Sequence, residues 1–171
     1  MASSGLHSNG YSLARHVLLE RAGLPFDGYV EELGRPLGEE LLEPTRIYAQ
    51  DCLALAAECE VKTFCHVTGG GLAGNLSRVI PENLTARLSR GTWTPGQIFR
   101  TIQSLGQVSQ EEMEKTFNMG VGMVAVVSAN DRDRALAMLA ARHIPSWELG
   151  TVTESADGEE RVELTGSHPG Y

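Results

Sequence analysis

Residues 61–80 read VKTFCHVTGGGLAGNLSRVI and join a short apolar run, a turn of three glycines and a helix-like segment. Residues 61–67 are too few for a helix and are rich in β-branched and aromatic side chains, so we expect a buried strand. Gly69, Gly70 and Gly71 lack a Cβ atom and allow a sharp turn with positive φ. Their backbone N–H groups, beside the positive end of a following helix, favour an anion as ligand. A tight strand-to-helix turn without a ligand is the alternative interpretation.

The same glycines can be tested against two familiar nucleotide-binding patterns. Gly69, Gly71 and Gly74 satisfy GxGxxG after a predicted strand. A dinucleotide fold also needs an acidic residue about 20 residues further on, where this chain has Ser89 and Arg90. A P-loop is excluded because no Gly-Lys-Ser/Thr follows the glycines.

Length and composition are those of one globular domain. The chain has 171 residues, of which 42% are hydrophobic and 21% are charged. The net charge of −8 and the lack of a basic run disfavour a nucleic-acid partner. The sequence shows no apolar stretch of membrane-spanning length and no secretory signal, so we expect no membrane partner.

Cysteine usage points to a reducing compartment. Cys52, Cys59 and Cys65 form an odd count without a disulfide pattern. Cys52 and Cys59 would lie about 10 Å apart along a helix, which is too far for a disulfide. No CxxC or HExxH motif is present, so we expect no metal site and a cytoplasmic location.

Hydrophobic periodicity predicts a mixture of helices and strands, and hence an α+β fold with a mixed β-sheet covered by helices. The expected helices cover residues 11–21, 44–58, 71–80, 95–105, 110–115 and 130–142, and the expected strands cover residues 61–67, 84–88, 123–127, 147–154 and 161–164. The strand at 123–127 should be central in the sheet. Gly120 and Gly122 before it suggest a bulge or a close approach to the backbone.

Local signals add details to these elements. Pro44 suits the first turn of its helix, with Ile47 on the packed face. Thr94 and Ser109 each begin a capping-box pattern. Asp157 and Gly158 predict a hairpin turn between the last two strands. Residues 23–43 are expected to form a loop-rich connector, and residues 166–171 a frayed tail.

The loop at residues 3–10, SSGLHSNG, has two interpretations. Ser8 and Asn9 are good N-cap residues for the helix that follows, which would make the loop a cap with a flexible end. Alternatively the loop is a second ligand-binding loop, with His7, Ser8 and Asn9 as hydrogen-bond donors.

Three strings together carry a family resemblance: SSGLHSNGYSLAR (3–15), CHVTGGGLAGNLSRVIPENL (65–84) and TFNMGVGM (116–123). In this order and spacing they resemble the aminoimidazole ribonucleotide synthetase family, the phosphoribosylformylglycinamidine cyclo-ligases. The resemblance runs over nearly the whole chain and covers the C-terminal half of that family. It implies that residues 1–171 form a single C-terminal, substrate-side domain, with the N-terminal ATP-binding domain absent from this chain.

The resemblance implies an ATP-dependent ring closure in purine biosynthesis. Formylglycinamidine ribonucleotide is phosphorylated on its formyl amide oxygen, an amidine nitrogen attacks the activated carbon, and aminoimidazole ribonucleotide forms. The cofactors would be ATP and Mg²⁺, held mainly by the N-terminal half. The partners would be the ribonucleotide substrate, the protein's own N-terminal half and a second subunit in a homodimer. The isolated chain is expected to be inactive.

The resemblance also assigns candidate site residues. His66, before the glycine turn, would donate to a phosphate or polarise a leaving oxygen, and a structural histidine is the alternative. Asn118 is a further candidate at the start of the glycine-bearing strand. The substrate- or phosphate-binding candidates are His7, Ser8, Asn9, Thr68, Gly69, Gly70, Gly71 and Asn118. A non-catalytic phosphate-ligand-binding or regulatory domain of the same fold is the alternative function.

Overall fold

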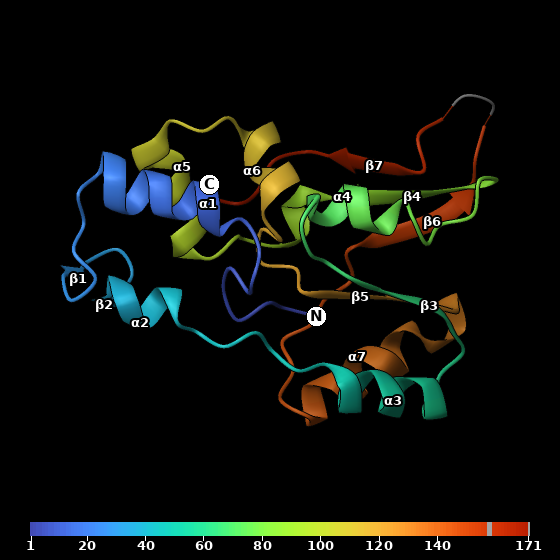
Figure 1. The fold of residues 1–171 in the computed structure, drawn as a ribbon. Helices are drawn as coiled ribbons and strands as arrows, with labels where there is room; N and C mark the ends of the chain where they lie inside the picture. The colour runs from blue at the N-terminus through green and yellow to red at the C-terminus, as the bar shows by residue number, and fades with distance from the viewer. Residues whose placement is uncertain (157–158, 171) are drawn as a thin grey trace.

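A computed structural model describes residues 1–156 and 159–170 of the chain. It confirms an α+β architecture with helices around mixed sheets (Figure 1). The helices are α1 (Tyr11–Arg15), the π-helix η1 (His16–Arg21), α2 (Leu37–Leu41), α3 (Ala49–Glu58), α4 (Gly71–Leu76), the 3-10 turn η2 (Arg90–Thr92), α5 (Gln97–Gly106), α6 (Gln110–Thr116), the 3-10 turn η3 (Ala129–Asp131) and α7 (Arg132–Ala141). The strands are β1 (Tyr29–Val30), β2 (Arg35–Pro36), β3 (Val61–His66), β4 (Leu84–Ser89), β5 (Met123–Val127), β6 (Gly150–Glu154) and β7 (Val162–Thr165).

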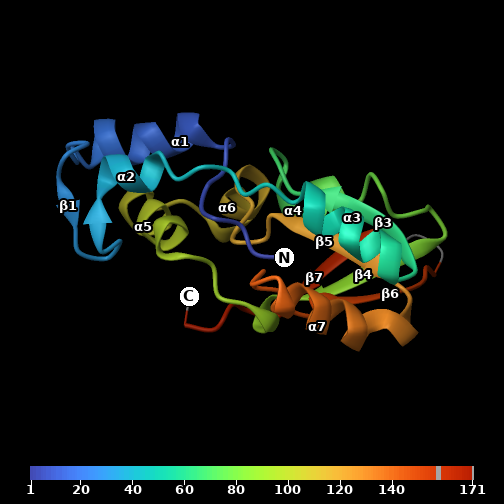
Figure 2. The same ribbon diagram turned by 90° about the horizontal axis from the view of Figure 1, so that it is seen from below.

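The chain has a helical end and a strand-rich end. Figure 2 shows α1, α2 and α5 gathered at one end and β3 to β7 at the other. The core of the helical end includes Leu18, Leu37, Phe99 and Phe117, each at most 1% exposed. Within the described residues, no helix combines the length and the apolar character needed to cross a membrane.

The three-stranded sheet has the order β6-β4-β7, in which β4 is antiparallel to β6 and parallel to β7. This confirms a mixed sheet but contradicts the expected hairpin of the last two strands, because β4 lies between them. Ala86 and Leu88 of β4 are 0% and 5% exposed. A central position therefore buries more of the apolar surface of β4 than an edge position would. The expected turn at Asp157 and Gly158 lies outside the described residues.

A separate two-stranded sheet pairs β3 with β5 in antiparallel fashion, which confirms a strand at residues 61–66. Its expected burial is wrong, because Cys65 alone among the residues of β3 is buried and Lys62 and His66 are exposed. Cys65 and Val124 face α4 and the three-stranded sheet, whereas Phe64 and Ala125 face α3 and α7. Both faces are apolar, as the sequence of β5 suggests. The expected central position is wrong, because among the described strands β5 has one neighbour, β3.

Helix α3 begins at Ala49, so the expected start at Pro44 is wrong. The residues before α3 serve the N-terminal loop instead: the carbonyl of Pro44 accepts from Ser4 Oγ at 2.7 Å, and Tyr48 is 4% exposed. Ile47 is 82% exposed and does not pack as expected. The connector at residues 23–43 is more ordered than expected, since it contains β1, β2 and α2.

The two predicted capping boxes have different outcomes. Ser109 Oγ accepts from the N–H of Glu112 at 3.3 Å and caps α6, as predicted. Helix α5 is preceded by Gly96 and has no side-chain cap. Thr94 is engaged elsewhere, because its hydroxyl donates to the carbonyl of Pro169 at 3.2 Å.

The C-terminal residues pack against the fold, which contradicts the expected frayed tail. His168 is 5% exposed, and its Nε2 lies 3.7 Å from Oε1 of Glu114. Arg90 donates to both oxygens of the same carboxylate at 2.7 and 2.8 Å, and Gln110 donates at 2.8 Å. Burial raises the pKa of Glu114, but the hydrogen bonds from Arg90 and Gln110, together with the nearby His168, outweigh it and lower the pKa to about 2.

Neutralising this carboxylate should destabilise the fold. The ordinary pKa of 4.5 and the folded value of about 2 correspond to roughly 3 kcal/mol of stability, present above pH 4.5 and lost as the pH falls toward 2. We expect Glu114→Gln to lower the free energy of unfolding at neutral pH by about that amount and to flatten the acid dependence. Urea unfolding at several pH values measures both. The control is Glu111→Gln, an exposed carboxylate on the same helix; equal losses in the two variants would contradict the prediction.

Candidate functional site

The fold brings the N-terminal loop (residues 3–10) against the glycine turn (residues 68–71). A Cβ atom on Gly69 would lie 3.7 Å from Asn9 Oδ1. The rings of His7 and His66 have centroids 6.3 Å apart. Candidate residues from two distant motifs therefore lie at one place on the surface, where His66, Gly69 and Gly70 are exposed.

Tyr48 completes a three-ring cluster with His7 and His66, which we call the His–Tyr cluster. Its ring centroid lies 6.1 Å from each of the two imidazoles. Its hydroxyl donates to the carbonyl of Ala2 at 2.8 Å. A Cβ atom on Gly122 would lie 1.8 Å from that hydroxyl oxygen, which confirms the predicted close approach to the glycine-bearing segment. Burial, the main cause, raises the pKa of Tyr48 to about 12, so the phenol stays protonated and keeps this bond.

His7 carries a buried donor without a protein acceptor. Ser4 N–H donates to Nε2 at 3.1 Å, so the neutral ring bears its proton on Nδ1. Nδ1 is buried, and no described residue accepts from it. Burial lowers the pKa of His7, and the charges of His66 and Arg46 lower it further. The ring is therefore neutral near pH 7, with an N–H group suited to an oxygen atom of a ligand.

Gly70 and Gly71 each require glycine, for partly different structural reasons. Gly70 and Gly71 have φ values of 97° and 67°, which side-chain-bearing residues rarely adopt. A Cβ atom on Gly71 would also lie 1.6 Å from the carbonyl oxygen of Glu114 in α6. A Cβ atom on Gly70 would lie 3.7 Å from its nearest neighbours, the side-chain nitrogens of Arg78 and Asn75. The turn is thus pressed onto α6 at Gly71 and open at Gly70.

Asn75 holds the glycine turn, and the sequence analysis missed it. Its Nδ2 donates to the carbonyls of Thr68, Gly69 and Gly71 at 3.2, 3.2 and 2.7 Å. Its Oδ1 accepts from the Thr68 hydroxyl at 3.1 Å. An asparagine one helical turn after Gly71, on the buried side of α4, was the available signal.

Two further candidates, Asn118 and Ser8, form hydrogen bonds that involve the N-terminal loop. Asn118 is 0% exposed; its amide donates to the carbonyl of Gly5 at 2.9 Å and accepts from the N–H of Gly120 at 2.8 Å. It therefore positions the N-terminal loop. Ser8 is exposed and its hydroxyl pairs with that of Thr45 at 3.1 Å, so it does not cap α1, which is preceded by Gly10.

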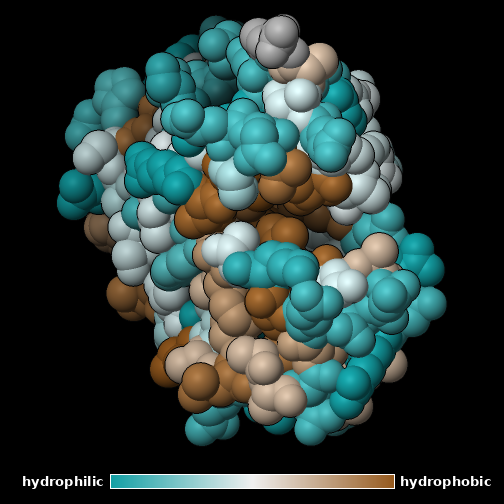
Figure 3. Space-filling view, turned by 90° about the vertical axis from the view of Figure 1, so that its right-hand side faces the viewer, coloured by the Kyte–Doolittle hydropathy of each residue, from teal (hydrophilic) through white to brown (hydrophobic). Residues whose placement is uncertain are grey.

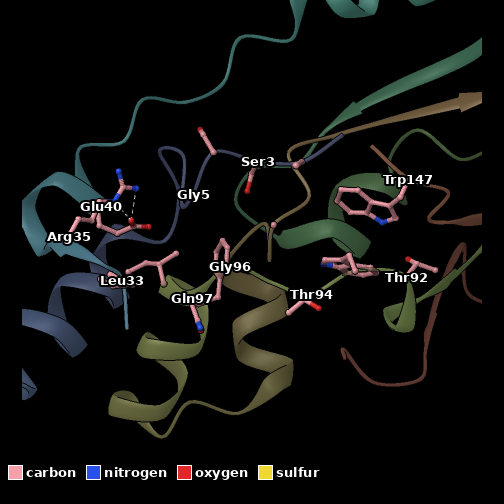
Figure 4. A pocket seen from close by; sticks show the side chains of 16 residues that line it. Ser3, Gly5, Leu33, Arg35, Glu40, Thr92, Thr94, Gly96, Gln97 and Trp147 are labelled. Atoms are coloured by element: carbon pink, nitrogen blue, oxygen red, sulfur yellow. Dashed lines mark hydrogen bonds and ion pairs between the residues drawn. The ribbon is translucent and has the colours of Figure 1, made fainter. Parts of the chain in front are cut away.

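A cavity of about 700 Å³ lies beside the first part of the same loop. Figure 4 shows Ser3 and Gly5 on one side of it, Gln97 and Thr94 on another, and Trp147 at one end. Its other walls include Ala2, Ser4, Leu33, Arg35, Glu40, Thr92, Trp93, Gly96, Ile98, Phe99 and Gly120. The N-terminal loop thus touches the cavity with residues 3–5 and the His–Tyr cluster with residue 7.

The cavity offers aromatic faces and neutral polar groups. Trp93 and Trp147 stack with centroids 6.3 Å apart, and the indole N–H of Trp93 donates to the carbonyl of Met119 at 2.9 Å. Arg35 is already paired with Glu40 and Glu43. Such a lining suits a planar polar group more than a bare anion.

Comparison with known families matches residues 1–163 to the C-terminal domain of AIR synthase related protein. A Streptomyces fradiae protein, provisionally named a phosphoribosylformylglycinamidine cyclo-ligase, is 57% identical over 98% of this chain and 94% of its own length. The phosphoribosylformylglycinamidine cyclo-ligases of Anaeromyxobacter dehalogenans 2CP-1 and Myxococcus xanthus are 48% and 49% identical over 96% and 93% of this chain. The chain spans about half the length of these two relatives, 47% and 46%.

A solved structure shares the fold. The crystal structure of thiamine-monophosphate kinase from Stenotrophomonas maltophilia K279a superposes with a TM-score of 0.64, over 97% of this chain and 49% of that one. The sequence identity is 16%, so the likeness concerns architecture alone.

Two alanine substitutions in α4 should act in opposite directions. Gly71→Ala should destabilise by more than about 3 kcal/mol, because its Cβ atom meets the backbone of Glu114. Gly74→Ala has nothing within 4 Å of the new atom and should stabilise by up to about 1 kcal/mol. Urea unfolding measures the difference. Similar effects at the two positions would show that Gly71 is not pressed onto α6.

Proposed function

Because this chain belongs to the AIR synthase related protein family, whose C-terminal domain it matches, we propose that it is the substrate-side domain of a phosphoribosylformylglycinamidine cyclo-ligase. The proposed reaction is the ATP-dependent closure of the imidazole ring of aminoimidazole ribonucleotide from formylglycinamidine ribonucleotide, in purine biosynthesis. We propose that residues 1–171 act as one domain. Three free cysteines support a reducing, cytoplasmic location.

The observation that carries this proposal is the meeting of the N-terminal loop with the glycine turn and His66. A phosphorylated substrate needs N–H donors that converge on oxygen atoms. His7 supplies a buried Nδ1–H without a protein acceptor. The exposed Gly69 and Gly70 supply main-chain N–H groups beside Asn9. The unpartnered N–H of His7 and the exposed main chain of Gly69 and Gly70 thus support the phosphate-binding role of these residues.

We assign the roles of the ring-bearing residues from their exposure. His66 is exposed at the end of β3 and can reach a bound substrate, where it would donate a proton or hydrogen bond to the departing oxygen. Tyr48 is buried and fixes the N-terminal loop through Ala2, so it would position His7 without touching substrate. Ser8, Thr68 and Asn118 would support the two loops.

The cavity beside Ser3 and Trp147 is large enough for the reacting part of a ribonucleotide. Its aromatic and hydroxyl-bearing walls suit the planar formylglycinamidine group. The N-terminal loop would then hold one substrate at two points, the phosphate near His7 and the planar group near Ser3.

ATP and Mg²⁺ need a different set of residues. Among residues 1–156 and 159–170, no three His, Cys, Asp or Glu side chains are grouped as a metal site requires. We propose that the N-terminal half of the cyclo-ligase holds both cofactors and that the complete enzyme is a homodimer.

The division of labour can be tested by complementation. We expect no ATP turnover with formylglycinamidine ribonucleotide from the 171-residue chain alone, and turnover when the N-terminal half of the Anaeromyxobacter dehalogenans enzyme is co-expressed. Turnover by the chain alone would overturn the division. Ribonucleotide binding without turnover in the complemented complex would favour the non-catalytic ligand-binding domain.

Substitutions in the complemented enzyme separate binding from chemistry. His66→Ala should lower kcat roughly 100-fold with a smaller change in KM, because its proposed contact forms at the developing charge. Gly70→Ala should raise KM instead, since the new atom blocks approach to the main-chain N–H groups while the fold survives. The control is His16→Ala, at an exposed histidine paired with Glu20. If His66→Ala and Gly70→Ala both left kcat and KM unchanged, the glycine turn and His66 would have structural roles only.

A further inference from the structure

Two arginines near the glycine turn receive no counter-charge from the protein. Most arginines of the described residues are paired with carboxylates: Arg35, Arg87, Arg90, Arg132, Arg134, Arg142 and Arg161. Arg46 and Arg78 form no ion pair and no side-chain hydrogen bond with any residue that the structure describes. A guanidinium group presents its N–H donors in a planar fork that matches the oxygen atoms of a carboxylate or a phosphate.

Arg46 lies on the segment that borders the N-terminal loop. The hydroxyl of its neighbour Thr45 pairs with that of Ser8 at 3.1 Å. Burial is the main cause that lowers the pKa of His7, and the charges of His66 and Arg46 lower it further. The charge of the half-buried Arg46 is therefore felt at the ring whose N–H group has no protein acceptor.

Arg78 lies at the other loop of the site. It follows α4 in the chain and is exposed, and one of its guanidinium nitrogens is 3.7 Å from the position of a Cβ atom on Gly70. Burial raises the pKa of the Cys65 thiol to about 11, and the charge of Arg78 opposes this rise. The side chain of Arg78 thus reaches back from the end of α4 to the open side of the turn.

The contacts order these groups along one strip of the surface. The order is Arg46, Thr45, Ser8, Asn9, Gly69, Gly70 and Arg78, in which each residue neighbours the next along the chain or across the two loops. The exposed main chain of the glycine turn therefore has a positive charge on each side of it. An anion bound there is within the field of both charges.

The arginines that line three other hollows are already neutralised. Arg35 in the cavity of about 700 Å³ is paired with two glutamates, and Arg90 in a cavity of about 220 Å³ is paired with Glu114. Arg132, at a groove of about 400 Å³ between α7 and β4, is paired with two carboxylates. Figure 3 shows brown, apolar residues gathered in a hollow across the middle of that face. Since the chain carries a net charge of −8, an anion needs such local, unpaired cations.

We propose that Arg46 and Arg78 supply the positive charge of a site for a phosphate monoester, which binds at the N–H groups between them. This inference rests on the proposed function, because it names the residues that neutralise the phosphate of the ribonucleotide substrate. Two guanidinium charges match the charge of a phosphate monoester, which is close to −2 at neutral pH. A carboxylate, with a single charge, would neutralise only one of the two arginines.

Binding of ribose 5-phosphate to the 171-residue chain tests the two arginines directly. Isothermal titration calorimetry compares the unaltered chain with Arg46→Gln and Arg78→Gln. We expect each substitution to weaken binding at least roughly tenfold, because each removes charge-assisted hydrogen bonds to the phosphate. Neither arginine has a partner in the fold, so both variants should unfold at the same temperature as the unaltered chain.

Arg134→Gln is the matched control. It removes the same charge from an exposed arginine that is paired with Glu58, away from the site, and it should leave the affinity unchanged. Arg78→Lys should recover part of the lost affinity, because a lysine keeps the charge but not the planar fork. Ribose without a phosphate should not bind measurably.

Three results would overturn the proposal. They are no binding of millimolar ribose 5-phosphate by the unaltered chain, equal affinity in Arg46→Gln, Arg78→Gln and the control, and binding of acetate as tight as that of ribose 5-phosphate. These measurements need neither ATP nor the N-terminal half. A complemented enzyme without turnover would therefore contradict the proposed reaction and leave the binding result intact. Normal turnover with an unchanged KM in both arginine variants would contradict this assignment and leave the reaction intact.

Discussion

The contact between Gly71 and the carbonyl of Glu114 is the constraint on which the site depends. The backbones approach so closely there that a single added carbon would lie 1.6 Å from the oxygen. This fixes the glycine turn on α6. Helix α6 leads on to Asn118, whose amide binds the carbonyl of Gly5 in the N-terminal loop at 2.9 Å. Two loops far apart in sequence are thus positioned by one helix, and the spacing between their polar groups follows from it.

The parts of the fold that the sequence predicted are those decided by local chemistry. Strand β3, the apolar stripe of α5 and the cap at Ser109 each depend on neighbours within a few residues. The failures are long-range. Thr94 does not cap α5, because its hydroxyl donates to the carbonyl of Pro169. Strand β7 pairs with β4 rather than with β6, the strand that precedes it in the chain. A single sequence carries no signal for such partners.

The candidate site shows the same division. Glycines and small polar residues marked the N-terminal loop and the glycine turn, because positive φ and exposed N–H groups leave a local signature. The function of Tyr48 depends on Ala2 and on the bare backbone of Gly122, neither of which is near it in sequence. Gly122 in the sequence predicted that another group would approach its backbone. That this group is the Tyr48 hydroxyl could be seen only in the folded chain. The cavity near Trp147 could not be predicted from the sequence either, because its lining residues come from distant parts of the chain.

The central place of β4 in its sheet has a consequence for biosynthesis. The ribosome synthesises the chain from the N-terminus, so β4 (residues 84–89) emerges before its two partner strands, β6 (150–154) and β7 (162–165). Through that interval β4 is an unprotected strand with two open edges, at the stage when chains aggregate most readily. The parallel pairing with β7 closes a long loop and is intrinsically slow. Both edges of β4 are therefore covered only after the last strands of the domain have been synthesised.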